Sequence, residues 1–515
     1  MGGVSNTSEA IAPPSSAATA HREGVARNAF WLVVGQAITT ALAILLSAAL
    51  GRRLGAADFG VYYLITSIAT FVFVFVDWGP PQVVRDVARS PADAGRWLGA
   101  TVIWRTATPF LAGAFAIGIA WALGYPARTL ALGAVLIAAM TPLGLARAHG
   151  LVFRAVERMD DDATVTVSAK ILTVAVALPA LALGGGLGSV IAAQGAAAVV
   201  ALVIGAAIYR RRRLPRLTVD LATVRALFWG GLPILTMSLA AYGQTYVDSL
   251  VLARLASPRS VGWYAAARNF IGTLIAPATI LATASYPRLS RLAADPEAFR
   301  VEVRAALRPI LVLGMLAGVG TWLFADLAIG LVFGRAHFSP AIAILRLSAP
   351  VIFLYFVDVL LGMAIMAAGR ERRFSAVKVA AVVIGTVLDI LLVPWCEARF
   401  GNGGLGVELA EIAAETVMGA AALAIIPHGT VNRHVLGDLA RTLAAGAGAL
   451  LAGEGLSSLH PAIGLPLAVG VYAALVYALG LVSRDDLALI VATVRRRRGG
   501  ARTAAAPPGE RGGSA

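Results

Sequence analysis

The sequence predicts an all-α membrane protein of about fourteen transmembrane helices, arranged as two parallel six-helix repeats followed by two further helices. Three observations predict this fold: an apolar composition, basic residues concentrated on one side of the membrane, and a motif that returns about two hundred residues later. Of the 515 residues, 58% are hydrophobic and only 14% are charged, and the mean hydropathy is +0.79. Soluble domains are about a quarter charged, so this composition places the chain in a bilayer.

A helix needs about 20 mostly apolar residues to cross the hydrocarbon core. The stretches that fit are 29–50, 60–84, 99–122, 129–151, 166–184, 188–209, 227–253, 262–286, 309–332, 342–367, 376–395, 404–426, 438–459 and 463–482. Residues 1–28 are polar, and we expect a disordered cytoplasmic N-terminus without a cleavable signal peptide. Residues 484–515 are expected to form a basic, disordered cytoplasmic tail.

The basic residues orient the helices. If both termini are cytoplasmic, 32 of the 43 Lys and Arg residues fall in cytoplasmic segments, seven in outward loops and four inside spans. Cytoplasmic loops of membrane proteins carry such an excess. Runs such as Arg210–Arg213 and Arg495–Arg498 then anchor helices near anionic headgroups, so the net charge of +15 needs no nucleic-acid partner. The single cysteine, Cys396, excludes an internal disulfide, and no cofactor or metal site is predicted.

Two motif pairs predict the internal repeat. Gly60-Val61-Tyr62 aligns with Gly262-Trp263-Tyr264 at an offset of 202, and Arg52 then aligns with Arg254. Further on, GGLGSVIAAQGAAAV from Gly185 matches GGLGVELAEIAAETV from Gly403. The matches give an N-terminal six-helix lobe (29–209), a basic cytoplasmic linker (210–226), a C-terminal lobe (227–426) and helices 13 and 14 (438–482). Parallel repeats are typical of transporters whose substrate site lies between the halves.

Arg52 and Arg254 follow the first helix of each repeat, on the outward side. They are interpreted either as interface residues that reach toward the headgroups or as direct ligands of a substrate. Tyr62 and Tyr264, which follow closely in each repeat, suit the aromatic belt at the membrane interface.

The same motifs resemble a known family. Arg-x-Leu, a short loop, Phe-Gly-x-Tyr and then DWGPPQVVRDVAR (Asp77–Arg89) resemble the start of Wzx-type polysaccharide transporters, and SYPRLSRL continues the pattern in the second half. The resemblance covers most of 28–430 and extends to the superfamily that includes the lipid II flippase MurJ and the MATE multidrug exporters. It implies a non-enzymatic flippase of the bacterial cytoplasmic membrane. Its implied partners are a polyprenyl-diphosphate-linked glycan, membrane lipids and polysaccharide polymerase or assembly proteins.

Charged residues inside the predicted spans define the candidate site, because an ionisable group at membrane depth faces a cavity or a partner. The substrate-cavity candidates are Arg105, Asp248, Arg268 and Arg346. Guanidinium groups form paired, charge-assisted bonds with phosphate oxygens, and the resemblance implies that an arginine in helix 8, here Arg268, binds the diphosphate. The alternative is an internal ion pair, such as Arg268 with Asp248.

Acidic residues form a second candidate set, for coupling to an ion. Its members are Asp389, Glu408, Glu411 and Glu415. The three glutamates fall within about 60° of one another on one helix face, so they repel unless a proton or a cation is bound. The alternative is that they pair with arginines of neighbouring helices. Asp326 and Asp358 are further acidic residues at membrane depth.

Two other functions are considered. A MATE-type cation-coupled drug antiporter predicts twelve helices and a cavity dominated by carboxylates. A membrane glycosyltransferase or polymerase predicts a large outward loop with acidic residues, and the outward loops of this sequence are at most about ten residues long.

Overall fold

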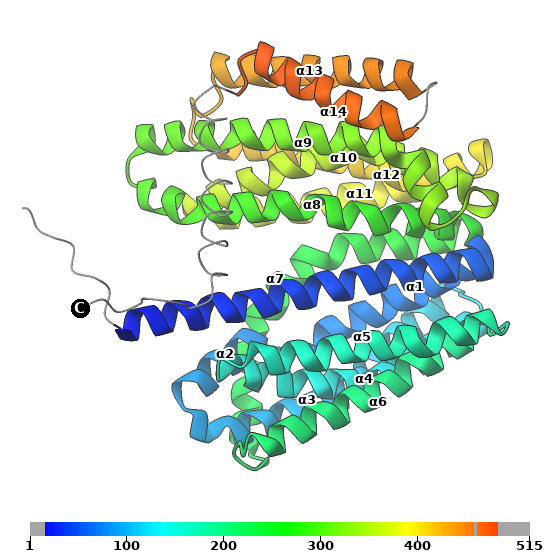
Figure 1. Ribbon diagram of the computed structural model, residues 1–515, viewed down its shortest axis with the longest axis vertical. Coiled ribbons are helices and arrows are strands. Elements are labelled where there is room, and N and C mark those ends of the chain that lie inside the picture. The colour runs from blue at the N-terminus through cyan, green and yellow to red at the C-terminus, as the bar shows by residue number, and fades with distance from the viewer. Residues whose placement is uncertain (1–15, 458–460, 483–515) are drawn as a thin grey trace, which may run out of the picture. The chain divides into compact units, whose positions relative to one another are not determined.

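The computed structural model describes residues 16–457 and 461–482, and the described residues form helices and no strand (Figure 1). Residues 1–15 and the predicted tail at 484–515 lie outside them. The elements are α1 (Ser16–Val76), α2 (Pro80–Arg89), a short 3-10 helix (Pro91–Asp93), α3 (Ala94–Ala122), α4 (Ala127–Ala155), α5 (Met159–Ala182), α6 (Leu187–Arg211), α7 (Leu221–Leu255), α8 (Pro258–Leu292), α9 (Pro296–Val332), α10 (Arg335–Ala367), α11 (Glu371–Phe400), α12 (Gly404–Ile425), α13 (Arg433–Ser457) and α14 (Pro461–Ala478).

The first element contains two of the predicted helices. α1 is interrupted at Gly55, whose φ of 77° and ψ of 177° lie outside the helical region. Only glycine adopts this conformation without strain, so Gly55 separates the predicted spans 29–50 and 60–84. α1 begins at Ser16, so residues 16–28 are helical and not irregular.

The second predicted span is shorter in the structure than in the sequence prediction. α1 ends at Val76, and Gly79, with a φ of 65°, precedes Pro80 and Pro81 at the start of α2. Proline suits the first helical position because its missing N–H would have no intrahelical partner. With α1 counted as two helices and α2 set apart, the described helices correspond to the fourteen predicted spans. Ten described helices are long and apolar enough to cross a membrane, and the predicted fold class is confirmed.

The chain forms two compact units. Unit 1 comprises Met1–Asn269, Ile329–Ala341 and Gly385–Val407, and unit 2 comprises Phe270–Ala328, Ile342–Ile384 and Glu408–Ala515. In unit 1, α4 packs against α3 and α6, α5 packs against α1 and α6, and α7 packs against α1 and α3. Unit 1 therefore contains helices of both predicted repeats.

Unit 1 has two apolar cores. In one, Ile65 and Val72 of α1 pack with Leu136 of α4, and all three are buried. In the other, buried side chains of α2, α3, α4 and α7 meet, among them Val83 and Phe153. The second core explains why α2, too short to cross a bilayer, is held in place: its apolar side is part of the helix bundle.

The linker between the repeats is fixed to α3 by close backbone contact. A Cβ at Gly95 would overlap the carbonyl oxygen of Arg216, and one at Gly99 would overlap that of Thr218. The Thr218 backbone N–H also donates to Gly95 O at 3.2 Å. The linker therefore lies on a surface of α3 that only glycine leaves open.

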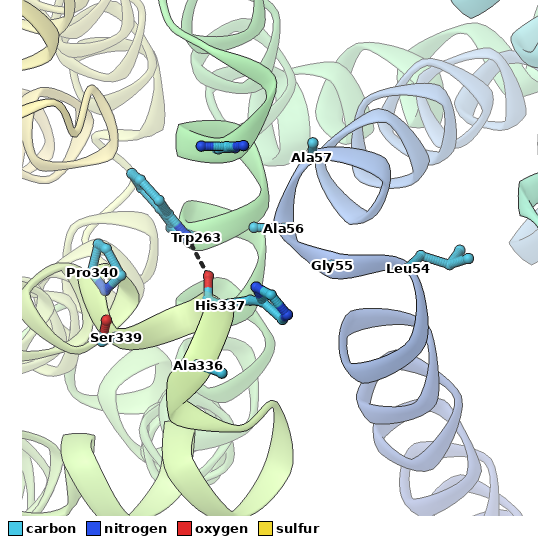
Figure 2. A pocket seen from close by; sticks show the side chains of 10 residues that line it. Leu54, Gly55, Ala56, Ala57, Trp263, Ala336, His337, Ser339 and Pro340 are labelled. Atoms are coloured by element: carbon cyan, nitrogen blue, oxygen red, sulfur yellow. Dashed lines mark hydrogen bonds between the residues drawn. The ribbon is translucent and has the colours of Figure 1, made fainter.

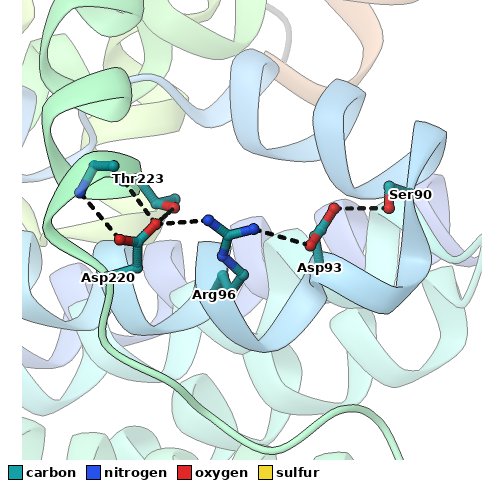
Figure 3. Close-up of polar contacts among 6 residues, drawn as sticks. Ser90, Asp93, Arg96, Asp220 and Thr223 are labelled. Atoms are coloured by element: carbon teal, nitrogen blue, oxygen red, sulfur yellow. Dashed lines mark hydrogen bonds and ion pairs between the residues drawn. The ribbon is translucent and has the colours of Figure 1, made fainter.

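Asp220 ends the linker and begins α7. Its carboxylate accepts the backbone N–H groups of Ala222 and Thr223, at 3.2 and 3.1 Å, as an N-cap. Arg96 Nη2 donates to Asp220 Oδ2 at 2.8 Å, and Arg96 also reaches Asp93 (Figure 3). The Thr223 hydroxyl and the Arg96 guanidinium hold the pKa of Asp220 well below its usual value.

In unit 2, α13 and α14 pack side by side (Figure 1) and form a core with residues of α9. Ala445 and Ala449 of α13 are fully buried beside Val319 of α9 and Tyr472 of α14. Small residues allow membrane helices to approach closely. The Tyr472 hydroxyl donates to Val312 O at 2.7 Å, which satisfies a polar group where no water is present.

Candidate functional site

The candidate site in unit 1 is built around Arg268 of α8. The Arg268 Cζ atom lies 6.0 Å from the centre of the Tyr264 ring, one helical turn earlier, and the arginine is half-buried. Tyr264 is 0% exposed, so its side chain is enclosed by the protein. A guanidinium over an aromatic face is attracted by the ring's quadrupole, and this contact fixes the direction of the cation.

Tyr63 of α1 joins this cluster from the first repeat. Its ring meets Tyr264 edge-on with 6.1 Å between centroids, and its hydroxyl lies 3.2 Å from Ser249 Oγ of α7. The charges of both Arg268 and Asp248 act on Tyr63. Asp248, on α7 beside Ser249, is only 2% exposed. The structure therefore places two of the four cavity candidates, Arg268 and Asp248, around one tyrosine.

A polar contact on the far side of α8 completes the set. Ser47 Oγ donates to Asn269 Oδ1 at 3.4 Å. The cluster thus draws on both segments of α1, on α7 and on α8, which are the first two helices of each predicted repeat. It combines a cation with hydroxyl and amide groups, the set that binds phosphate and sugar oxygens. The sequence analysis missed Tyr63, although it directly follows the aligned Tyr62.

Arg105 of α3 has a different environment. Its side chain is 1% exposed, with Nη2 2.7 Å from Asp77 Oδ1 and Nη1 donating to Gly144 O at 2.9 Å. Asp77 is 38% exposed and also lies 3.7 Å from Arg147. None of these contacts is with the Arg268 cluster. Arg105 therefore follows the alternative of an internal ion pair, and the structure does not bring it to the candidate site.

Arg346 of α10 belongs to unit 2 and is exposed. Its Cζ lies 6.0 Å from the Trp322 ring of α9, and Trp322 Nε1 donates to Glu454 Oε1 of α13 at 2.9 Å. The indole ring of Trp322 explains how Arg346 is held at the surface of α10.

The clearest acidic site is in unit 2, where Glu415 of α12 meets Asp358 of α10. Their relative exposures are 6% and 4%, and among the described residues both oxygens of Asp358 and Oε2 of Glu415 are buried without a hydrogen-bond donor. Lys378 of α11 supplies the nearest opposite charge, and Lys378 and Asp358 both line a cavity of about 220 Å³. Two carboxylates side by side in a low-dielectric interior cannot both stay ionised without a proton or a cation. The sequence analysis had not paired Asp358 with Glu415.

The remaining acidic candidates are distributed along α11 and α12. Glu411 is half-buried and its charge acts on Glu415, as their shared helix face predicts. Asp389, 1% exposed, belongs to unit 1, and Glu408, 0% exposed, is the first residue of the last segment of unit 2.

Comparisons with known proteins agree with the observed architecture. The family described as "Polysaccharide biosynthesis protein" matches residues 25–293, and the MatE family matches residues 233–391. The comparison with curated proteins found no match. Among solved structures, the lipid II flippase MurJ in an inward closed conformation is similar with a TM-score of 0.65 and 13% identity, over 86% of this chain and 97% of that chain. An inward-facing multidrug resistance MATE family transporter gives 0.59 and 14%, over 76% and 98%.

The described helices have the fold of MurJ and of the MATE transporters, and the MatE family model matches part of the second half of the chain. The family match extends over more than half of the sequence. The protein therefore belongs to the polysaccharide biosynthesis protein family, and the resemblance to Wzx-type flippases is confirmed.

Proposed function

We propose that this protein translocates a polyprenyl-diphosphate-linked oligosaccharide from the inner to the outer leaflet of a bacterial cytoplasmic membrane, for cell-surface polysaccharide synthesis. The observation that carries the proposal is Arg268, held on Tyr264 where the first helices of both repeats meet. A guanidinium there presents paired donors to diphosphate oxygens, and the neighbouring hydroxyl and amide groups suit sugar hydroxyls. The family membership supports the same class of substrate.

The physical task is to move a dianionic headgroup through hydrocarbon. Crossing unaided would cost tens of kcal/mol by simple ion-solvation arguments, and a cavity with a fixed cation replaces the lost hydration. The prenyl tail stays in the surrounding lipid throughout. An inside-negative potential favours outward movement of an anion by about 2.3 kcal/mol per charge per 100 mV, so the potential supplies part of the driving force.

Alternating access completes the cycle. The helices of 29–209 rock against those of 227–426, so that the headgroup enters from the cytoplasmic leaflet and leaves on the outside. Both termini lie in the cytoplasm, as the excess of basic residues in the inner loops predicts. Polymerase or assembly proteins then take up the exported glycan.

The substrate is tested by native mass spectrometry of gently extracted protein. Wild type and Arg128→Ala, which removes an exposed outward arginine far along the chain from the cluster, should retain a polyprenyl-diphosphate glycan. Arg268→Ala should lose it by about tenfold or more, since a charge-assisted pair is removed. Equal retention in Arg268→Ala would keep the lipid as substrate and remove Arg268 from its site. Arg346→Ala shows whether a second arginine takes part.

Ion coupling is assigned to the acidic set, above all to Glu415 with Asp358. In liposomes loaded with the lipid, Glu415→Gln should abolish the dependence of transport on a pH gradient while the potential-driven part remains, because the neutral amide neither binds nor releases a proton. Glu297→Gln, at the start of α9, is the matched control, since Glu297 is exposed and, within the described part of the chain, pairs only with Arg300. An unchanged response to the pH gradient in Glu415→Gln would exclude this residue from coupling.

The second candidate function is a cation-coupled drug antiporter, which the match of the MatE family to residues 233–391 favours. The two functions separate in the same preparations. Absence of any lipid-linked glycan in wild type, together with cation-driven dye efflux from liposomes, would establish the antiporter.

A further inference from the structure

Two arginines at equivalent positions of the repeats make the same contact, each on a helix of the opposite repeat. Arg52, after the first helix, donates from Nε to Val332 O at 2.9 Å and from Nη2 to Leu331 O, at the end of α9. Arg254, at the end of α7, donates from Nε to Leu123 O at 2.6 Å, at the end of α3. In the repeat, α7 corresponds to the first helix and α9 to α3, so the two contacts are reciprocal.

Both acceptors are the unpaired ends of helices of the same form. α3 is followed by Gly124 with a φ of 79°, and α9 by Gly334 with a φ of 84°. The last carbonyl groups of a helix have no intrahelical partner and carry a partial negative charge. A guanidinium beside these carbonyl groups donates hydrogen bonds to them and balances their partial negative charge. Arg52 and Arg254 therefore act as caps for helices to which they do not belong.

The backbone between the two caps is in direct contact. Gly60 and Gly262, aligned by the repeat, face each other: a Cβ on Gly60 would overlap Pro258 O and lie 2.8 Å from Gly262 N. A Cβ on Gly262 would overlap Ala56 O. Segments of the two repeats thus cross where only two glycines allow it.

Further hydrogen bonds hold outward segments of the second repeat beside this crossing. Trp263 Nε1 of α8 donates to His337 O of α10 at 2.8 Å, beside a cavity of about 430 Å³ where α1 is interrupted at Gly55 (Figure 2). Glu397 of α11 accepts the Ser260 hydroxyl at 2.7 Å. All these residues lie in unit 1 and in the outward segments of the predicted topology.

We propose that Arg52 and Arg254 form a reciprocal latch that holds the outward side closed between transport events. The inference rests on the alternating access proposed above. Because each arginine belongs to one repeat and its acceptors to the other, separation of the outward ends breaks both caps at once. A cation at a helix end shifts an equilibrium by about 2- to 30-fold, so two caps broken together multiply their effects.

The test measures how often the outward side opens. A reporter, Ser47→Cys in a Cys396→Ala background, lies five positions before Arg52 on α1, and right-side-out cells are treated with a membrane-impermeant maleimide. Arg52→Gln and Arg254→Gln should each raise the labelling rate about 3- to 10-fold, and the double variant by roughly the product. The labelling rates of Arg52→Lys and Arg254→Lys should lie between those of wild type and the Gln variants, because one charged donor remains. Arg53→Gln, at the adjacent exposed arginine, should label like wild type.

Complete labelling in denaturant shows that the thiol is present, and the Lys variants supply folded protein if a Gln variant is poorly expressed. Equal rates in wild type, both single variants and the double variant would overturn the latch. An effect of only one arginine would overturn its reciprocity. The labelling assay does not measure a lipid-linked substrate, so its result holds even if the proposed substrate is wrong.

Discussion

Arg105 and Arg268 have the same signature in the sequence, an arginine in the middle of an apolar helix, but the structure gives them opposite surroundings. Arg105 is 1% exposed and is enclosed by Asp77 and Gly144 O, both from neighbouring first-repeat segments. Arg268 is half-buried and lies on Tyr264, beside groups from both repeats. In the alternating-access cycle proposed above, the Arg105 ion pair keeps its geometry, whereas the surroundings of Arg268 change.

The difference shows that an arginine within a predicted span can be held inside one repeat or lie where the two repeats meet. Around Arg105 the protein supplies a carboxylate and a backbone carbonyl as acceptors, and only 1% of the side chain is exposed. The Arg268 guanidinium lies over the face of the Tyr264 ring, which Tyr63 of the first repeat meets edge-on. Arg105 is therefore enclosed within the first repeat, whereas the surroundings of Arg268 include side chains of both repeats.

The largest expected effect is a loss of stability in the region around Arg105. Asp77→Asn leaves the Arg105 charge buried without its carboxylate, and removing one partner of such a pair costs about 3–5 kcal/mol. Thermal unfolding in detergent should show a drop in midpoint far larger than that of Arg268→Ala. Lipid retention per folded molecule should be unchanged.

The double variant Asp77→Asn with Arg105→Met is the control for this prediction. Replacing both partners by groups without charge is often neutral, so the double variant should recover much of the lost stability. An Asp77→Asn variant as stable as wild type would show that Arg147, 3.7 Å from Asp77, or water compensates for the pair, and the contrast with Arg268 would fail.

The second prediction concerns the region where the repeats meet. Gly262 lies two residues before Tyr264, and Gly262→Ala places a Cβ against Ala56 O. Overpacking of this kind costs about 1–3 kcal/mol. Because the displaced backbone carries Tyr264 and Arg268, lipid retention should fall together with stability. Gly188→Ala, where no atom lies within 4 Å of the added Cβ, should be neutral or slightly stabilising. Wild-type lipid retention in Gly262→Ala would show that the close contact at Gly262 does not affect the candidate site.

The sequence predicted much of the fold because its signals are local or periodic. Apolar length fixed the helices, and the Gly-x-Tyr repeat correctly brought Gly60 and Gly262 into corresponding positions. The break between Val76 and Pro80 was missed, since Asp77–Gly79 is too short to interrupt an apolar window.

The pairings within the site could not be predicted in the same way. Asp77 and Arg105, or Asp358 and Glu415, meet only because particular helices face one another, and that choice depends on packing over many residues. The same limit applies to Arg52, which was interpreted as an interface residue or a ligand contact. Its acceptors are backbone carbonyls at a helix end far along the chain, and a carbonyl leaves no signal in a sequence.

The smallest expected effect concerns Asp220, a half-buried carboxylate at the start of α7 that serves as a reference for the buried Arg105. Hydrogen bonds from Thr223 and Arg96 depress the pKa of Asp220 below its ordinary value of 3.8, so its charge stabilises the folded state at pH values above 3.8. That contribution is lost as the pH falls below 3.8 toward the depressed value. Asp220→Asn keeps an N-cap side chain but removes the charge. Its melting temperature should be slightly below that of wild type at pH 7, and the two should converge as the pH is lowered below 3.8. A gap that stays constant over this range would mean that the cap geometry, and not the charge paired with Arg96, holds the start of α7.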